Sequence, residues 1–187
     1  MEHIYQQPQF GENWFSYPNL YSRFVHELPS GSKIVEVGCW KGKSLAYLGV
    51  EIVNSEKSIS VDAVDTWDAV DTEYWWQKTD THVLSKTLYA LFLSNISCLS
   101  HIIKPVRMMS LDAANLYENE SLDAVFIDAC HDYECVKEDI KAWLPKVKKN
   151  GYLSGHDYSS HPSVQMAVHE LLGSVESGED CWIYRKP

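Results

Sequence analysis

The sequence predicts an α/β fold with a doubly wound, Rossmann-like and mostly parallel sheet that ends in an antiparallel hairpin. Short β-branched segments alternate with helical segments along most of the 187 residues, and this alternation is typical of parallel sheets. A chain of this length buries roughly 70% of the surface that its unfolded form exposes. That is enough core for one sheet between two helical layers.

We expect one domain over residues 1–187, in which residues 1–28 form a leader and an N-terminal helix. A Pro-Ser-Gly turn precedes the first strand. Strands and helices then alternate, with predicted strands at 33–37, 59–65 and 102–106 and predicted helices at 44–54 and 81–95. Residues 67–80 are polar and rich in Trp and Tyr, and we expect this insertion to form a lid.

The second half of the chain continues the alternation. The run 124–128 is a continuous apolar segment that ends in an acid, as in a strand buried on both faces. Further predicted elements are helices at 110–117, 133–147 and 162–172, a strand at 151–156, and a hairpin whose arms lie near 175 and at 181–184. The hairpin turn is expected at Ser177-Gly178.

The composition excludes several functional classes. The formal net charge is −10, whereas a protein that binds nucleic-acid backbones normally has a basic face. Five cysteines form an odd set without paired C-x-x-C spacing, so we expect no disulfide framework, no structural zinc site and a cytoplasmic location. No run approaches the ~20 apolar residues that span a bilayer. A small-molecule acceptor is the expected partner, without nucleic acid or membrane.

The loop after the first strand predicts a nucleotide-cofactor site. Gly38 and Gly42 allow a tight turn close to a ligand, and Ser44 can cap the next helix. Trp40 stands where a dinucleotide loop has its middle glycine, and Glu36 would repel a pyrophosphate. A carboxylate there suits a cationic cofactor with an amino group, such as S-adenosylmethionine. The alternative is a strand-to-helix turn without a ligand.

Polar residues stand at the ends of the next strands, where ligands of open α/β sheets bind. Asp65 ends the second strand and can accept hydrogen bonds from both ribose hydroxyls; Asp62, inside that strand, is the competing candidate. Ser110 follows the third strand and can bond the adenine edge, while Leu111 packs on its face. Each polar residue taken alone is equally well explained as a helix N-cap.

Two histidine–carboxylate pairs follow the fourth and fifth strands. Asp128 and His131 form the first pair, and His156 and Asp157 form the second. Two carboxylates that share a site either raise the pKa of one of them or recruit a divalent cation. A histidine ligand shifts the preference from magnesium or calcium toward manganese, iron or zinc. His131 is the candidate base because histidine titrates near neutrality; the alternative is that both histidines are polar caps.

Together these motifs resemble class I S-adenosylmethionine-dependent methyltransferases, particularly the small O-methyltransferase branch near the cephalosporin-hydroxylase-like and macrocin-type enzymes. The resemblance runs from about residue 14 to residue 187. It implies that the methionine part of the cofactor faces Glu36 and the glycine loop. The ribose would then face Asp65, and the adenine would face Ser110. The implied cofactor-binding set is Glu36, Gly38, Cys39, Trp40, Gly42, Ser44, Asp65, Ser110, Leu111 and Asp128.

The related catechol-type enzymes add a metal to this resemblance. In those enzymes an aspartate after strand four and two residues after strand five hold magnesium, and a lysine three places past the aspartate is the base. The resemblance implies that Asp128, His156 and Asp157 hold magnesium or manganese, and that His131 takes the place of the lysine.

The expected reaction is SN2 transfer of a methyl group from the sulfonium to a hydroxyl oxygen of a small molecule or sugar, with catalytic roles for His131 and Asp128. The expected acceptor lid comprises Trp14, Tyr17, Trp67, Tyr74, Trp75 and Trp76. Three alternatives are an NAD-dependent oxidoreductase, a non-catalytic binding module on the cofactor fold and a metal-dependent hydrolase. The chain is also a candidate for assembly into a homodimer.

Overall fold

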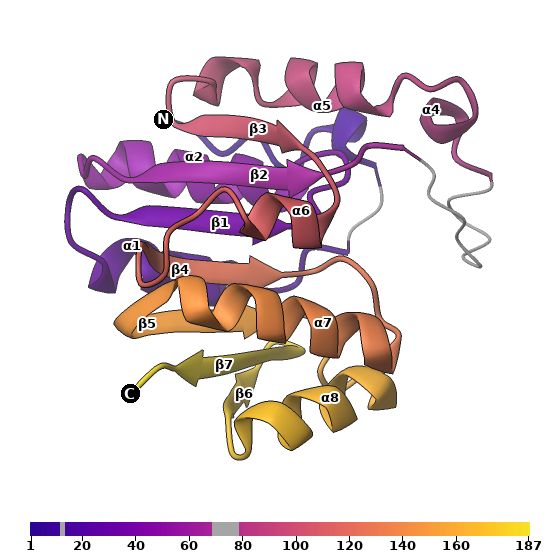
Figure 1. Cartoon of the computed structure of the whole chain (residues 1–187). Coiled ribbons are helices and arrows are strands. Elements are labelled where there is room, and N and C mark those ends of the chain that lie inside the picture. Colours follow the sequence, from indigo (N-terminus) through magenta and orange to yellow (C-terminus); the bar gives the residue numbers. More distant parts are fainter. Residues whose placement is uncertain (12–13, 69–78) are drawn as a thin grey trace.

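The centre of the computed structural model is a seven-stranded sheet in the order β3-β2-β1-β4-β5-β7-β6 (Figure 1). The structure describes residues 1–11, 14–68 and 79–187. The first five strands of that order run parallel, whereas β7 pairs antiparallel with β5 and with β6. The predicted fold class, including the C-terminal antiparallel hairpin, is confirmed.

The strands follow the apolar runs of the sequence. They are β1 (Lys33–Val37), β2 (Ser60–Asp65), β3 (Ile103–Arg107), β4 (Leu122–Ile127), β5 (Val147–Gly155), β6 (Glu176–Gly178) and β7 (Cys181–Arg185). Successive side chains of a strand point to opposite faces. In β1, Ile34 enters one core cluster while Val35 and Val37 enter the other. Glu36 therefore shares the face of Ile34.

Helices cover both faces of the sheet. The first core cluster joins the sheet to α1 (Pro18–Glu27), α2 (Lys43–Ser55) and α5 (Leu88–Asn95), and the second joins it to α6 (Ser110–Ala114), α7 (Tyr133–Trp143) and α8 (Pro162–Leu172). The short elements are α4 (Thr81–Leu84), η1 (Pro8–Phe10), η2 (Ser97–Leu99) and η3 (Leu144–Lys146). Among the described residues, no helix has both the length and the apolar character needed to cross a bilayer.

The chain order creates a switch point beside β1. β1 pairs with β2 on one side and with β4 on the other, so the connections after β1 and β4 leave the sheet in opposite directions. In doubly wound folds this crevice is where ligands bind. The topology thus places the loop after β1 next to Asp128, which follows β4.

Several predicted boundaries are wrong. The helix expected at 81–95 is divided into α4 and α5, and Lys86 between them has a φ of 57°. The helix expected through 147 ends at Trp143 because the chain continues as η3, which contains a proline. The helix expected at 110–117 ends at Ala114, and β5 begins four residues before the predicted start of its strand.

The hairpin turn also differs from its prediction. Gly178 is the last residue of β6, and the turn consists of Glu179 and Asp180, whose φ angles are 55° and 60°. Positive φ at both central residues is the geometry of the two-residue turn that matches strand twist. A Ser-Gly pair is an ordinary turn signal, but the strand register places it inside the strand.

Candidate active site

A large cavity opens at the carboxyl ends of the parallel strands. Its volume is about 1380 Å³, above the usual ~300–1,000 Å³ of a site for one small ligand. Residues at or just after the carboxyl ends of all five parallel strands line it, including Gly38, Asp65, Ser110, Asp128 and His156. The cavity therefore has room for a cofactor and a second, acceptor molecule.

The loop after β1 requires glycine at two positions. Gly38 has a φ of +88°, and a Cβ there would lie 2.0 Å from the carbonyl oxygen of Asp128. Gly42 has a φ of +82°, forms the N-cap of α2, and would place a Cβ 3.1 Å from the Phe92 ring. Trp40 between them has a φ of 47° and lines the cavity. The loop thus passes close to β4 and presents backbone to the cavity.

Asp65 holds this loop and also lines the cavity. Its Oδ2 accepts hydrogen bonds from the backbone N–H groups of Cys39 (2.8 Å) and Trp40 (2.9 Å), and its Oδ1 accepts one from Trp67 (2.8 Å). Burial raises the pKa of Asp65, although these N–H groups act in the opposite direction. The backbone N–H of Thr66 acts in the same direction, so four N–H groups surround a carboxylate that has about four acceptor sites. A ribose hydroxyl would therefore have to share an oxygen with one of these N–H groups.

Asp62, the competing ribose candidate, lies elsewhere. Its carboxylate accepts a hydrogen bond from the Tyr117 hydroxyl (2.8 Å) and pairs with the Lys33 ammonium (2.8 Å). It is buried and is not among the residues that line the cavity. Of the two aspartates in β2, the geometry therefore favours Asp65 as a ligand-binding group.

Glu36 lies beneath the loop rather than in the cavity lining. It is fully buried, and it accepts hydrogen bonds from the hydroxyl of Tyr21 in α1 and from Ser44 Oγ (2.6 Å) in α2. Burial raises its pKa to about 8, because the two hydroxyl donors lower it by less. The predicted Ser44 cap is wrong: the N-cap is Gly42, and the Ser44 hydroxyl is directed to Glu36.

Ser110 also has internal partners. Its hydroxyl donates to Asp139 Oδ1 and accepts a hydrogen bond from the Trp143 indole N–H (2.9 Å), both from α7. Burial raises the pKa of Asp139 to about 6. Ser110 still lines the cavity together with the half-exposed Leu111. The sequence contained no signal for the Asp139 contact, because the two residues lie on separate helices.

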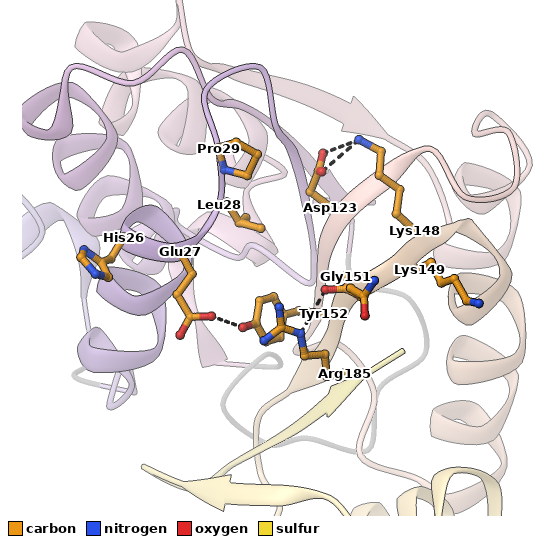
Figure 2. A pocket seen from close by; sticks show the side chains of 11 residues that line it. His26, Glu27, Leu28, Pro29, Asp123, Lys148, Lys149, Gly151, Tyr152 and Arg185 are labelled. Carbon is orange, nitrogen blue, oxygen red and sulfur yellow. Dashed lines mark hydrogen bonds and ion pairs between the residues drawn. The ribbon is translucent and has the colours of Figure 1, made fainter. Parts of the chain in front are cut away.

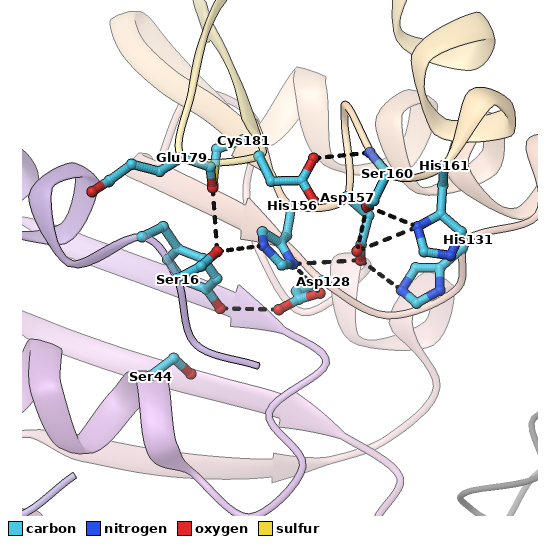
Figure 3. Close-up of polar contacts among 12 residues, drawn as sticks. Ser16, Ser44, Asp128, His131, His156, Asp157, Ser160, His161, Glu179 and Cys181 are labelled. Atoms are coloured by element: carbon cyan, nitrogen blue, oxygen red, sulfur yellow. Dashed lines mark hydrogen bonds and ion pairs between the residues drawn. The ribbon is translucent and has the colours of Figure 1, made fainter. Parts of the chain in front are cut away.

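The histidine–carboxylate pairs meet in one network, the acid–imidazole cluster, which we define as Asp128, His131, His156, Asp157 and His161 (Figure 3). His131 Nε2 lies 2.8 Å from Asp157 Oδ2. His156 Nδ1 lies 3.5 Å from Asp157 Oδ2 and 3.7 Å from Asp128 Oδ1. Asp157, with a φ of 61°, thus stands between several imidazole rings.

Residues that were not predicted to contact these histidines and carboxylates complete the cluster. The Tyr17 hydroxyl donates to Asp128 Oδ2 (2.9 Å), and Ser16 Oγ lies 3.0 Å from His156 Nε2 and donates to the Glu179 carbonyl oxygen (3.3 Å). His161 Nδ1 lies 3.3 Å from Asp157 Oδ1. Tyr17 was expected only as a lid residue. Ser16 and His161 were not predicted, although His161 is four residues after Asp157.

Mutual contacts shift the pKa values of the cluster. Burial lowers the pKa of His156, but hydrogen bonds to Asp128 and Asp157 outweigh it and raise the value to about 10. For His131 too, burial acts downward and the Asp157 carboxylate raises the pKa overall. Burial acts to raise the pKa of Asp157, yet its two imidazole partners, His131 and His156, lower it overall. At neutral pH, His156 is therefore an imidazolium between two carboxylates.

The aromatic lid prediction is partly outside the described residues, since Tyr74, Trp75 and Trp76 belong to the segment 69–78. Trp14 is 46% exposed and lines the cavity. Trp67, in contrast, is 2% exposed and is not among the described residues that line the cavity. Its ring packs against α5, and its indole N–H donates to the Trp40 carbonyl oxygen (2.9 Å).

A smaller cavity of about 390 Å³ lies at the amino ends of β4 and β5 (Figure 2). The Lys148 ammonium pairs with both carboxylate oxygens of Asp123 there (2.9 Å each). The Tyr152 hydroxyl donates to Glu27 on the opposite wall. This cavity lies at the end of the sheet away from the switch point. The larger cavity is therefore the candidate active site.

Comparison with known proteins identifies the family of this chain. A family model described as a methyltransferase domain matches residues 35–158, which include the loop after β1, Asp65, Asp128 and the start of the segment after β5. An uncharacterized protein of Acanthamoeba polyphaga mimivirus is 31% identical over 61 residues, which are 31% of this chain and 28% of that protein. The chain thus matches less than a third of the length of that relative.

Two solved structures share the fold. The O-methyltransferase NovP has a TM-score of 0.67 and 15% identity over 91% of this chain and 79% of its own. A TDP-rhamnose 3'-O-methyltransferase of calicheamicin biosynthesis has a TM-score of 0.60 and 14% identity over 90% of this chain and 76% of its own. Because the family model covers well over half of the sequence, this chain belongs to the methyltransferase domain family and carries a class I S-adenosylmethionine-dependent methyltransferase domain.

Proposed function

We propose that this enzyme methylates a hydroxyl oxygen of a small molecule or sugar, with His131 as the base. The observation that carries the proposal is the 2.8 Å contact of His131 Nε2 with Asp157 at the cavity wall. The two structural neighbours described above are O-methyltransferases by title, and they support an oxygen acceptor. The family match favours this reaction over the oxidoreductase and hydrolase alternatives.

The residues around the loop after β1 suit S-adenosylmethionine. The glycine-lined turn lets a ligand approach the backbone, and Asp65 lines the cavity at the end of β2, where ribose hydroxyls can share its oxygens with the loop N–H groups. We assign the adenine to the wall formed by Met109, Ser110 and Leu111, and the methionine end to the loop near Gly38. Glu36 supports the loop from below, through Tyr21 and Ser44. When bound, the cofactor supplies an electrophilic methyl group on its sulfonium.

His131 and Asp157 act together on the acceptor proton. His131 Nδ1 is buried, which leaves Nε2 as the nitrogen that an acceptor hydroxyl reaches. Nε2 faces the Asp157 carboxylate at 2.8 Å, so the acceptor hydroxyl has to enter between the two groups to give its proton to Nε2. The Asp157 carboxylate then lies beside the imidazolium and stabilises its charge. Tyr17 holds Asp128, and Ser16 holds His156, on the other side of the same wall.

Asp128, His156 and Asp157 fit a divalent cation as donors. Each offers one ligand atom, and these atoms lie within 4.8 Å of one another. Two carboxylate oxygens and an imidazole nitrogen suit manganese, iron or zinc better than magnesium. A cation there would polarise the acceptor oxygen as a Lewis acid. Because the pKa of His156 is about 10, a cation that takes all three ligands has to displace its proton.

The finer assignments stay predictions. They are the cephalosporin-hydroxylase-like or macrocin-type branch, magnesium or manganese as the metal, a homodimer, a cytoplasmic location, and the extent of one domain over residues 1–187. The acidic sequence, with a net charge of −10, supports a small-molecule acceptor over nucleic acid.

Two measurements test the proposal. A thermal melt with S-adenosylhomocysteine at 100 times its dissociation constant should show about 2.7 kcal/mol of stabilisation, and NAD should give none. With a hydroxylated acceptor, His131→Asn should lower kcat by about 100-fold or more, as expected for loss of a general base. His101→Asn, at an exposed histidine outside the cavity, is the matched control.

The KM for S-adenosylmethionine should stay within about twofold in His131→Asn, because the cofactor residues are unchanged. If His131→Asn keeps kcat within about threefold of wild type, the base assignment is wrong. If NAD stabilises the protein and S-adenosylhomocysteine does not, the assignment of the cofactor cavity is wrong.

A further inference from the structure

A second cluster of ligating side chains lies on the wall of the cavity, between β4 and α7. We call it the thiol cluster: Cys130, Asp132 and Cys135. One sulfur or carboxylate oxygen from each residue lies within 4.8 Å of the other two, and the Cys130 sulfur is 3.9 Å from Asp132 Oδ2. All three residues line the cavity. The proposed methyl transfer uses none of them.

The start of α7 explains how six consecutive residues bring three donors together. Asp132 is the N-cap of α7, and Cys135 lies in the first turn, so its side chain returns toward the preceding loop. An N-cap aspartate ordinarily accepts hydrogen bonds from the first N–H groups of the helix. The Asp132 carboxylate makes no such bond and instead lies beside the Cys130 thiol. Helix capping therefore does not explain where the Asp132 carboxylate lies.

The donor set matches one class of cation. Zinc binds thiolates at about 2.3 Å and carboxylate oxygens at about 2.0–2.2 Å in a tetrahedron, so the sulfur and oxygen ligands lie roughly 3.5 Å apart. The observed separation of 3.9 Å needs only a small adjustment. Thiolates select soft or borderline cations and disfavour magnesium and calcium. Three protein ligands also leave a fourth position open, as in zinc sites that keep a water or bind substrate.

We propose that Cys130, Asp132 and Cys135 bind a thiophilic divalent cation such as zinc, with the fourth coordination position open to the active-site cavity. This site has its own ligands, separate from the oxygen and nitrogen donors of Asp128, His156 and Asp157. Two of its ligands, Cys130 and Asp132, flank His131 in the loop before α7. A bound cation joins that loop to the first turn of α7 and limits the movement of the proposed base.

Cobalt titration of the reduced, chelator-treated full chain tests the proposal, because cobalt replaces zinc and reports its ligands optically. We expect one equivalent of cobalt to produce a thiolate-to-cobalt charge-transfer band that zinc then removes. Cys130→Ser and Cys135→Ser should each abolish the band, and Asp132→Asn should weaken cobalt binding about tenfold. Cys98→Ser, at an exposed cysteine outside the cluster, is the matched control and should keep the band.

The outcomes separate this site from the proposed methyltransferase chemistry. Asp157→Asn removes a residue of the acid–imidazole cluster and should leave the thiolate band unchanged. Absence of the band in the wild type, or its persistence in both cysteine variants, overturns the proposal even if methylation proceeds as expected. Cys135 is exposed, so Cys135→Ser tests the site without disturbing the core, whatever the effect of Cys130→Ser on folding.

Discussion

The buried Glu36 predicts an unusual pH dependence of stability. Its side chain has no exposed surface, and its hydrogen-bond donors are two uncharged hydroxyls, those of Tyr21 and Ser44. Burial raises its pKa from 4.5 to about 8, against the weaker effect of the hydroxyls. Between these pH values, the folded protein keeps a proton that the unfolded chain has released.

The free energy of unfolding should therefore fall as the pH rises through this range. One proton of difference changes it by about 1.4 kcal/mol per pH unit, so the separation between 4.5 and about 8 for Glu36 corresponds to roughly 5 kcal/mol at pH 9. The total stability of a domain is only about 5–15 kcal/mol. Ionisation of this single carboxyl thus opposes folding by an amount comparable to the net stability.

Glu36→Gln isolates the effect, because the amide has the shape and neutrality of the protonated acid. Urea unfolding at pH 5 and pH 9 should give similar stabilities for both proteins at pH 5 and a variant several kcal/mol more stable at pH 9. Glu118→Gln, at an exposed glutamate, should leave the pH dependence of wild type unchanged. Parallel pH profiles of Glu36→Gln and wild type would refute the buried-proton argument.

Two other predictions concern the loop and the base. Gly38→Ala should lower the free energy of unfolding by more than about 3 kcal/mol in urea, because its Cβ would lie 2.0 Å from a carbonyl oxygen. Gly178→Ala, with open space around it, should change it by less than about 1 kcal/mol, and equal losses would contradict the steric argument. Because the pKa of His131 is raised by Asp157, kcat/KM should increase with pH through a midpoint above 6.5, and Asp157→Asn should move that midpoint downward. If the midpoint of the pH–rate profile does not move in Asp157→Asn, His131 is not the group whose titration controls the rate.

The local sequence determined the architecture. Short apolar runs alternate with helical periodicity, and parallel strands bring their carboxyl ends to one edge of the sheet. The position of Asp65, Asp128 and His156 around one cavity follows from this rule alone. Gly38 was also predictable, because a tight turn after a strand calls for a residue that tolerates positive φ.

Only the tertiary structure decided which partner each polar side chain has. Ser44 and Ser110 are ordinary helix-start residues in the sequence, yet their hydroxyls bond to Glu36 and Asp139, which lie far away along the chain. Glu36 faces the helices rather than the cavity because strand alternation sets its direction. Sequence spacing cannot identify such contacts, because they depend on how separate helices pack on the sheet.

In the acid–imidazole cluster too, the sequence predicted which residues meet, and the tertiary structure decided which of them pair. The sequence placed a histidine and a carboxylate at the ends of two neighbouring strands, from which a shared site was predicted. The fold determined that His131 pairs with Asp157 rather than with Asp128, which is nearer in the sequence. It also brought Ser16 and His161 into contact with the cluster. Strand order is a property of local patterns, whereas hydrogen-bond partners follow from the packing of the whole chain.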